Sequence, residues 1–207
     1  GVSFALRHGR TLGIVGESGS GKTVLVRSIM RLNLGSTVTT TGTVEFNGRE
    51  LLGIPIREMQ DLWGPELAMV FQDPMTSLNP LVRVSRQVTE HLHRHLGVNR
   101  DQARQTALEL MREVQIPEPE TRLRAFPHEL SGGMRQRVCI AIALACEPTL
   151  LFADEPTTAL DVTVQHQILN LLGREKRERE MTMVLVTHDL GVVAGRTDDT
   201  MVMYAGK

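Results

Sequence analysis

The stretch "GIVGESGSGKTVLVRSIM", residues 13–30, decides the fold of this chain. Within it, residues 16–23, "GESGSGKT", match the pattern G-x-x-x-x-G-K-[ST] in full. A strand-like apolar run precedes the match and a helix-like run follows it, which is the context that a phosphate-binding loop requires. A glycine–serine linker is the alternative, but a complete motif between a strand and a helix favours a loop that holds phosphate.

The residue types of this loop suit the chemistry of phosphate binding. Glycines let the backbone curl so that successive N–H groups point at phosphate oxygens, and the following helix adds its positive end. We expect Lys22 to reach the β- and γ-phosphates, and the hydroxyl of Thr23 to ligate Mg²⁺. The predicted nucleotide-binding residues are Gly16, Glu17, Ser18, Gly19, Ser20, Gly21, Lys22 and Thr23.

A second element is needed for turnover, and residues 149–156, "TLLFADEP", can supply it. An apolar strand here ends in two acids, as expected where the carboxyl edge of a sheet meets phosphates. Asp154 would hold Mg²⁺ through water, and Glu155 would polarise the attacking water as general base or water-positioner. Taken alone, the stretch also fits a strand followed by an acidic turn.

Two further polar residues follow apolar runs that read as strands. Gln72 follows "LAMVF", and His188 follows "MVLVT". Because the ends of parallel strands line one crevice, Gln72 can reach the metal or its water, and His188 can contact the γ-phosphate. Each residue by itself also fits an ordinary polar loop position.

A second glycine-rich turn lies far along the chain, in "ELSGGMRQRVCIAIALA", residues 129–145. Ser131 is a good helix N-cap, and Gly132 and Gly133 leave the first-turn amides unshielded, so this is another anion site. One phosphate chain cannot easily use two such cradles in one domain. We therefore expect a dimer in which each chain's Ser131 turn closes on its partner's nucleotide; a capped helix with a tight approach is the alternative.

The periodicity of the rest of the chain predicts an α/β fold with a mostly parallel sheet. A shorter alternating run, 43–47, reads as an exposed antiparallel strand, while 73–135 is helix-rich with one apolar stripe. The predicted buried strands are residues 11–15, 67–71, 149–153, 182–186 and 200–204. The predicted stripe comprises Ala103, Ala107, Leu110, Met111 and Val114.

Composition narrows the functional classes. The 207 residues carry a formal net charge of -1, so we expect no nucleic acid partner. No apolar run reaches the ~20 residues that span a bilayer and no signal peptide is visible, so a membrane connection would go through a partner. We expect Cys139 and Cys146 to be free core thiols, and the charged run 174–180, "REKRERE", to be a solvated helix face.

These motifs together resemble those of an ABC transporter ATP-binding subunit. "GESGSGKT" resembles its Walker A motif, "LLFADE" its Walker B motif, and Gln72 and His188 its Q-loop and H-loop. "TALD", 158–161, resembles its D-loop. The residues that resemble its signature motif are Leu130, Ser131, Gly132, Gly133 and Met134.

Longer phrases narrow the resemblance to the dipeptide, oligopeptide and nickel importer subfamily. They are "FQDPMTSLNP", "PHELSGGMRQR" and "DEPTTALDVTVQ", at 71–80, 127–137 and 154–165. The resemblance implies a P-loop NTPase (RecA-like) core formed by 1–72 and 136–207, which includes the antiparallel portion, and a helical signature subdomain at 73–135. All six motifs occur in the family's order and cover nearly the whole chain.

The resemblance also implies cofactors and partners. ATP and Mg²⁺ would bind between two head-to-tail ATPase subunits, alike or different, with Asp161 communicating across the dimer. Two transmembrane permease subunits would dock near the Q-loop and helical subdomain, and a solute-binding protein would deliver substrate. The subunit would lie at the cytoplasmic face of the cell membrane. A non-transport ABC ATPase of DNA repair or translation, or a nucleotide-binding fragment inactive alone, are the alternatives.

The sequence departs from the family pattern at three places. Met134 replaces the glutamine common at the end of the signature, although methionine is usual in this subfamily. The family's adenine-stacking aromatic would lie just before Gly1, and its C-terminal extension would follow "YAGK". We therefore expect both ends to be cut from a longer chain, and weaker nucleotide binding and dimerisation for this piece.

Overall fold

Five parallel strands form the central sheet of the computed structural model, which describes residues 1–32, 39–158 and 160–207. Their order is β4-β5-β6-β1-β7, and each neighbouring pair is parallel. The strands are β1 (Thr11–Val15), β4 (Leu67–Val70), β5 (Leu150–Asp154), β6 (Thr182–Thr187) and β7 (Asp199–Val202). Strands β1, β4 and β6 are buried along their whole length, which explains their continuous apolar runs. The bounds of the five predicted strands are confirmed to within two residues, but the prediction that 200–204 is buried is wrong, because β7 lies at the edge of the sheet and is mostly exposed.

A small antiparallel pair, β2 (Glu45–Phe46) and β3 (Arg49–Glu50), stands apart from this sheet. Asn47 and Gly48 connect the two strands with φ angles of 50° and 76°. Positive φ at both central residues is what a tight two-residue hairpin needs, and asparagine followed by glycine meets that need. The predicted antiparallel strand is therefore confirmed, although the paired part is short.

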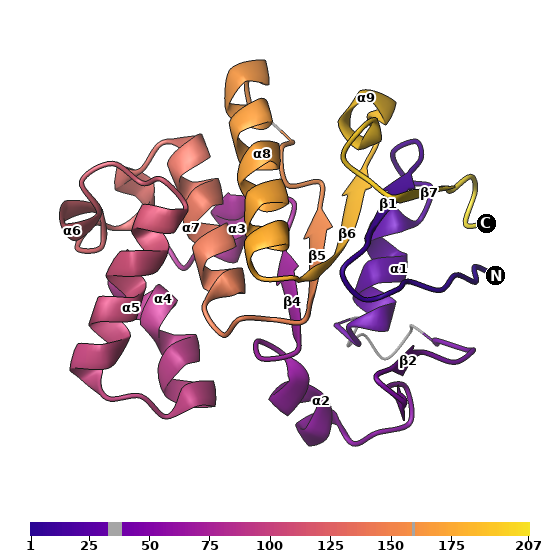
Figure 1. Ribbon diagram of the computed structural model, residues 1–207, viewed down its shortest axis with the longest axis horizontal. Helices are drawn as coiled ribbons and strands as arrows, with labels where there is room; N and C mark the ends of the chain where they lie inside the picture. The colour runs from indigo at the N-terminus through magenta and orange to yellow at the C-terminus, as the bar shows by residue number, and fades with distance from the viewer. Residues whose placement is uncertain (33–38, 159) are drawn as a thin grey trace.

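Helices cover the sheet and extend beyond its β4 edge. Figure 1 shows α4, α5 and α6 gathered on the β4 side, away from β7 and from both chain ends. The helices are α1 (Lys22–Ile29), α2 (Ile56–Leu62), α3 (Pro74–Ser77), α4 (Val84–His91), α5 (Arg100–Glu113), α6 (Pro119–Arg122), α7 (Gly132–Leu144), α8 (Val162–Glu178) and α9 (Leu190–Val193). A π-turn (Leu92–Leu96) extends α4, and a 3₁₀ turn (Pro127–Glu129) precedes α7.

Helix α5 carries the predicted apolar stripe into the core. All five residues of the stripe are buried and belong to one cluster with residues of α4, α7 and β5. Asn99 and Gln102 form a capping box that starts the helix in the right register for this packing. The core of the helical region is therefore continuous with one face of the sheet.

The charged run 174–180 lies at the end of α8 and just beyond it, and the prediction of a solvated face is wrong for Glu175. Glu175 is only 1% exposed. Arg174 and Arg179 both donate hydrogen bonds to its carboxylate, at 2.7 and 3.1 Å. Alternating charge along this helix therefore places two cations around one buried anion.

Both cysteines are free and buried, as predicted. Burial raises the pKa of Cys139 to about 12 and that of Cys146 to about 11, so both thiols stay protonated at neutral pH. In the described ranges of the chain, no helix combines the length and the apolar character needed to cross a bilayer.

Candidate active site

The carboxyl ends of four parallel strands meet at one edge of the sheet and create the candidate site. The loop 16–21 follows β1, Gln72 lies just beyond β4, Asp154 ends β5, and His188 follows β6. Asp154 lies opposite Val186 of β6, and the backbone N–H of Glu155 donates to the Val186 carbonyl at 2.9 Å. The sheet register therefore brings these distant stretches of sequence together, as expected for parallel strands.

The loop between β1 and α1 has the backbone that a phosphate cradle needs. Gly19 and Gly21 have φ angles of 82° and 99°, which disfavour other residues. A Cβ on Gly16 would lie 2.2 Å from the Met203 carbonyl oxygen, so this position excludes any side chain. No described side chain caps α1, so its N-terminal end is suited to an anion.

Lys22 is held inside this loop by backbone carbonyls. Its ammonium group donates to the carbonyl oxygens of Gly16 and Glu17 at 2.8 and 2.9 Å, and the residue is 4% exposed. The nearest carboxylate oxygen, on Glu155, lies 3.8 Å away. A buried cation with mainly neutral partners favours the arrival of an anionic ligand.

Asp154 and Thr23 form a pair suited to a hard cation. The Thr23 hydroxyl donates to Oδ1 of Asp154 at 3.1 Å, and Asp154 is 0% exposed. Its other oxygen, Oδ2, is buried and has no hydrogen-bond partner among the described residues. Burial raises the pKa of Asp154, although the Thr23 hydrogen bond opposes the shift. An orphaned carboxylate oxygen beside a hydroxyl fits Mg²⁺, which prefers oxygen ligands.

Glu155 has a backbone conformation that non-glycine residues rarely adopt, with φ at 44°. Three side chains converge on its Oε2: the Thr158 hydroxyl donates at 2.9 Å, Nε2 of Gln72 donates at 3.2 Å, and Nδ1 of His188 lies at 3.2 Å. Gln72 therefore contacts Glu155 and makes no hydrogen bond to the Thr23–Asp154 pair in the described structure. Glu155 and His188 therefore lie beside each other, and their joint catalytic role stays a prediction.

Thr158 is a member of this cluster that the sequence analysis missed. Its backbone N–H also donates to the Glu155 carbonyl at 3.2 Å, which closes a turn over 155–158. A hydroxyl three residues after the second acid of a strand end is the only sequence signal for this contact.

The second glycine turn starts α7, as predicted. Ser131 is exposed, and its Oγ accepts from the Met134 N–H at 3.3 Å, which is the N-cap hydrogen bond. A Cβ on Gly133 would lie 2.8 Å from Cγ1 of Val164 in α8, whereas one on Gly132 would lie 3.7 Å from Leu160. The alternative prediction, a capped helix that approaches its neighbour closely, is therefore confirmed at Gly133, where α7 lies close to α8.

Asp161 starts α8 in the same way, because its Oδ1 accepts from the Val164 N–H at 2.9 Å. Ala159, the middle of the "TALD" stretch, lies outside the described residues. In the described part of the chain, no hydrogen bond or ion pair joins 130–134 to 16–23. The two glycine turns therefore do not form one site through direct polar contacts.

Comparison with known protein families matches residues 1–158 to the family described as ABC transporter. Among curated proteins, the chain is 52% identical over 206 residues to the oligopeptide transport ATP-binding protein OppD of Salmonella typhimurium. It is 49% identical over 207 residues to the dipeptide transport ATP-binding protein DppD of Lactococcus lactis. Both alignments cover 100% of this chain but only 61% and 59% of the relatives, so the chain spans about three fifths of their length.

Solved structures agree with this match. The fold is similar to the dimeric post-hydrolysis state of the ATP-binding cassette MJ0796 bound to ADP and Pi, with a TM-score of 0.86, 30% identity, and coverage of 98% of this chain and 84% of that one. It is also similar to cbiO1 from Clostridium perfringens, part of the ABC transporter complex cbiONQ, with a TM-score of 0.82 and 26% identity over 100% of this chain and 78% of that one. The predicted fold, a P-loop NTPase with a mostly parallel sheet, is confirmed.

Replacing Gly133 by alanine should destabilise the fold, because the new methyl group would press on Val164 of α8. We expect a loss of about 1–3 kcal/mol in the free energy of unfolding, the usual cost of overpacking. Gly132→Ala is the matched control and should leave stability equal or slightly higher, since its methyl group meets only an ordinary contact. Denaturant unfolding of the two variants tests this, and equal stabilities would contradict the tight approach.

Asp154→Asn should stabilise the nucleotide-free protein at neutral pH. Because burial raises the pKa of Asp154 above its ordinary 3.8, the folded state favours the protonated carboxyl, and this stability is lost as pH rises through the folded pKa. The neutral amide removes that loss, so we expect a higher Tm at pH 7 and a Tm difference from wild type that shrinks toward pH 4. Asp61→Asn, at an exposed position, is the control. An unchanged or lower Tm for Asp154→Asn would refute the idea of an uncompensated buried charge.

Proposed function

The chain belongs to the ABC transporter family, and on that premise we propose that it is the ATP-binding and ATP-hydrolysing part of an importer for peptides or a related small solute. The observation that carries the proposal is the Glu155 cluster beside the Thr23–Asp154 pair, since it joins a water-activating carboxylate to a cation site. The names of the relatives, which are transport ATP-binding proteins for oligopeptides and dipeptides, favour the peptide class.

ATP would bind along the loop 16–23, with its phosphates at the amides of the loop and the first turn of α1. Lys22 would exchange its carbonyl partners for phosphate oxygens, and Thr23 and Asp154 would hold Mg²⁺. Gln72, which donates a hydrogen bond to Glu155, would reach the metal or its water. Bound Mg²⁺ neutralises charge on the β- and γ-phosphates.

Glu155 is the proposed general base or water-positioner. Its side chain is 10% exposed and is oriented through Oε2 by Thr158, Gln72 and His188, while its Oε1 lies 3.8 Å from the Lys22 ammonium group. His188 is 55% exposed at its side chain and can turn toward a γ-phosphate and the attacking water. A carboxylate fixed in this way needs little reorganisation before it accepts a proton.

A second ATPase subunit, alike or different, would complete the site. Ser131 and the amides of Gly132 and Gly133 lie at the exposed start of α7, where they can close on a partner's nucleotide. Leu130 and Met134 flank this turn, and Asp161 at the start of α8 would communicate across the dimer. The similarity to a dimeric cassette bound to ADP and Pi supports this arrangement.

Two transmembrane permease subunits would receive the motion, and a solute-binding protein would act indirectly. A groove of about 1360 Å³ between α4, α5 and the segment 120–124 offers one docking place on the proposed helical subdomain, 73–135. Phe71, Met75 and Leu81, exposed around the segment after β4, offer apolar contacts next to Gln72. The proposed core is 1–72 and 136–207, and the subunit would lie at the cytoplasmic face of the cell membrane, in contact with the permease subunits.

The test is Glu155→Gln in the full-length subunit assembled with its membrane partners. We expect retained ATP binding, a loss of about 100-fold or more in hydrolysis, and a trapped closed dimer that no longer imports solute. Glu147→Gln, at an exposed loop position, is the control. Equilibrium ATP binding, phosphate release and uptake into vesicles measure the three effects.

Unimpaired hydrolysis by Glu155→Gln would remove Glu155 from its role. Loss of hydrolysis without any effect on solute uptake, together with ATP-sensitive binding to DNA or ribosomes, would favour the non-transport alternative instead. Full hydrolysis by a verified monomer of residues 1–207 would contradict the need for a partner.

A further inference from the structure

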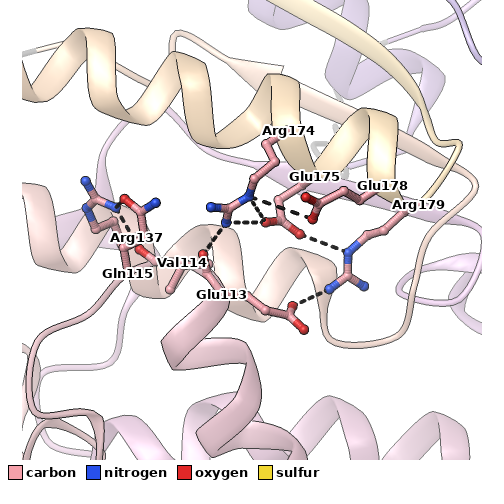
Figure 2. Close-up of polar contacts among 8 residues, drawn as sticks. All are labelled: Glu113, Val114, Gln115, Arg137, Arg174, Glu175, Glu178 and Arg179. Atoms are coloured by element: carbon pink, nitrogen blue, oxygen red, sulfur yellow. Dashed lines mark hydrogen bonds and ion pairs between the residues drawn. The ribbon is translucent and has the colours of Figure 1, made fainter.

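A closed ring of hydrogen bonds among four residues joins the end of α5 to the end of α8 (Figure 2). Arg174 donates to Oε1 of Glu175 at 2.7 Å and also to the backbone carbonyl of Glu113. Arg179 donates to Oε2 of Glu175 at 3.1 Å and to the Glu113 carboxylate at 2.5 Å. We call these four residues the arginine ring; it spans two segments more than 60 positions apart in sequence.

Glu175 is the buried centre of the arginine ring. Its side chain is 2% exposed, whereas those of Arg179, Arg174 and Glu113 are 18%, 31% and 45% exposed. A carboxylate at this depth is tolerated because both of its oxygens accept charged hydrogen bonds. In return, Glu175 holds both guanidinium groups in fixed orientations, so their remaining N–H groups point at Glu113.

The arginine ring contacts the C-terminal end of α5. The last carbonyl groups of a helix lack intrahelical partners, so they can accept hydrogen bonds from these arginines. Arg174 donates a hydrogen bond to the Glu113 carbonyl, and Arg137 of α7 donates one to the Val114 carbonyl at 2.7 Å. Cations at this end are also favoured by the helix dipole. Figure 2 shows both arginines directed at the same turn of α5 from two different helices.

Arg137 extends the connection between α7 and α8. Its second guanidinium nitrogen donates to Gln167 of α8 at 2.9 Å, and the residue is 7% exposed. One turn earlier, Gly133 of α7 meets Val164 of α8 at close range. Two consecutive turns of α7 are thus fixed on two consecutive turns of α8, and α5 is attached to both helices.

We propose that Glu175 is a positioning residue that couples α5 to α7 and α8. Helix α5 forms a wall of the groove proposed for the permease, while α7 and α8 begin at Ser131 and Asp161, the two residues proposed to act on the partner's nucleotide. The ring then transmits a displacement of α5 to both of these caps together. This inference rests on the proposed function for its direction, but the rigidity of the joint can be measured without it.

The experiment compares three variants of the full-length subunit. Glu175→Gln removes the buried charge at constant shape. Glu113→Gln replaces the charged hydrogen bond from Arg179 with a neutral one and leaves Glu175 paired with both arginines, so it weakens the ring with little risk to folding. Glu178→Gln is the matched control. Glu178 lies on the same turn as Glu175 and its side chain is 62% exposed. It is not part of the ring, and its carboxylate lies 3.8 Å from Nε of Arg174.

The first readout is the distance distribution between spin labels on exposed Glu109 of α5 and exposed Thr200 of β7, with and without ATP. The two thiols of residues 1–207 are buried. Any other cysteine of the full-length subunit is replaced first, so that labels attach to the introduced cysteines. We expect a broader distribution in Glu175→Gln and Glu113→Gln than in wild type and in Glu178→Gln. Wild-type distributions in both ring variants would overturn the proposal, and if Glu175→Gln fails to fold, Glu113→Gln decides alone.

The second readout is the ratio of permease-stimulated to basal hydrolysis in the assembled transporter. We expect this ratio to fall about five- to tenfold in the two ring variants, while the Kd for ATP stays at the wild-type value. A fall in kcat that only follows a weaker Kd or a lower Tm would mean a purely structural role. If wild type itself shows no stimulation, the proposed function fails, and the label distances still report on the joint.

Discussion

The structure depends on a buried carboxylate oxygen, Oδ2 of Asp154, that no described group satisfies. The end of β5 places it beside Thr23, and a carboxylate at this depth weakens the fold unless a cation compensates it. The sheet register then brings Glu155 and the residues around it to the same edge. We infer that this edge of the sheet is less stable than a fully paired one, because it is the place where a cation and a phosphate chain bind together.

Two residues near this oxygen also lower the stability of the ligand-free fold. Glu155 adopts a left-handed backbone conformation, and Lys22 is buried with mostly neutral partners, so both residues are costly to fold without a ligand. The arginine ring is different, because its charges are balanced within the protein. We infer that the nucleotide edge is left unsatisfied so that ligands can complete it, while the connections between α5, α7 and α8 are kept rigid.

Much of this organisation could be predicted from the sequence, because buried parallel strands read as continuous apolar runs and the loop 16–23 has a strict pattern. The contacts of Gln72 and Thr158 with Glu155 could not, since each depends on the direction of a side chain in a loop. The burial of Glu175 was also missed. Its charge pattern is that of a solvated helix, and the sequence does not show that Arg179, which pairs with it, also pairs with Glu113 of α5, far away in sequence.

The central claim is that one chain's loop 16–23 needs another chain's Ser131 turn. The most direct measurement is ATP hydrolysis by a mixture of two full-length variants, Lys22→Ala and Ser131→Asp, where aspartate keeps the N-cap of α7 but repels phosphate. Each variant alone should be inactive, while an equal mixture should recover about a quarter of wild-type activity, because half of the dimers carry one intact composite site. A mixture as inactive as its components, beside an active wild type, would contradict the account.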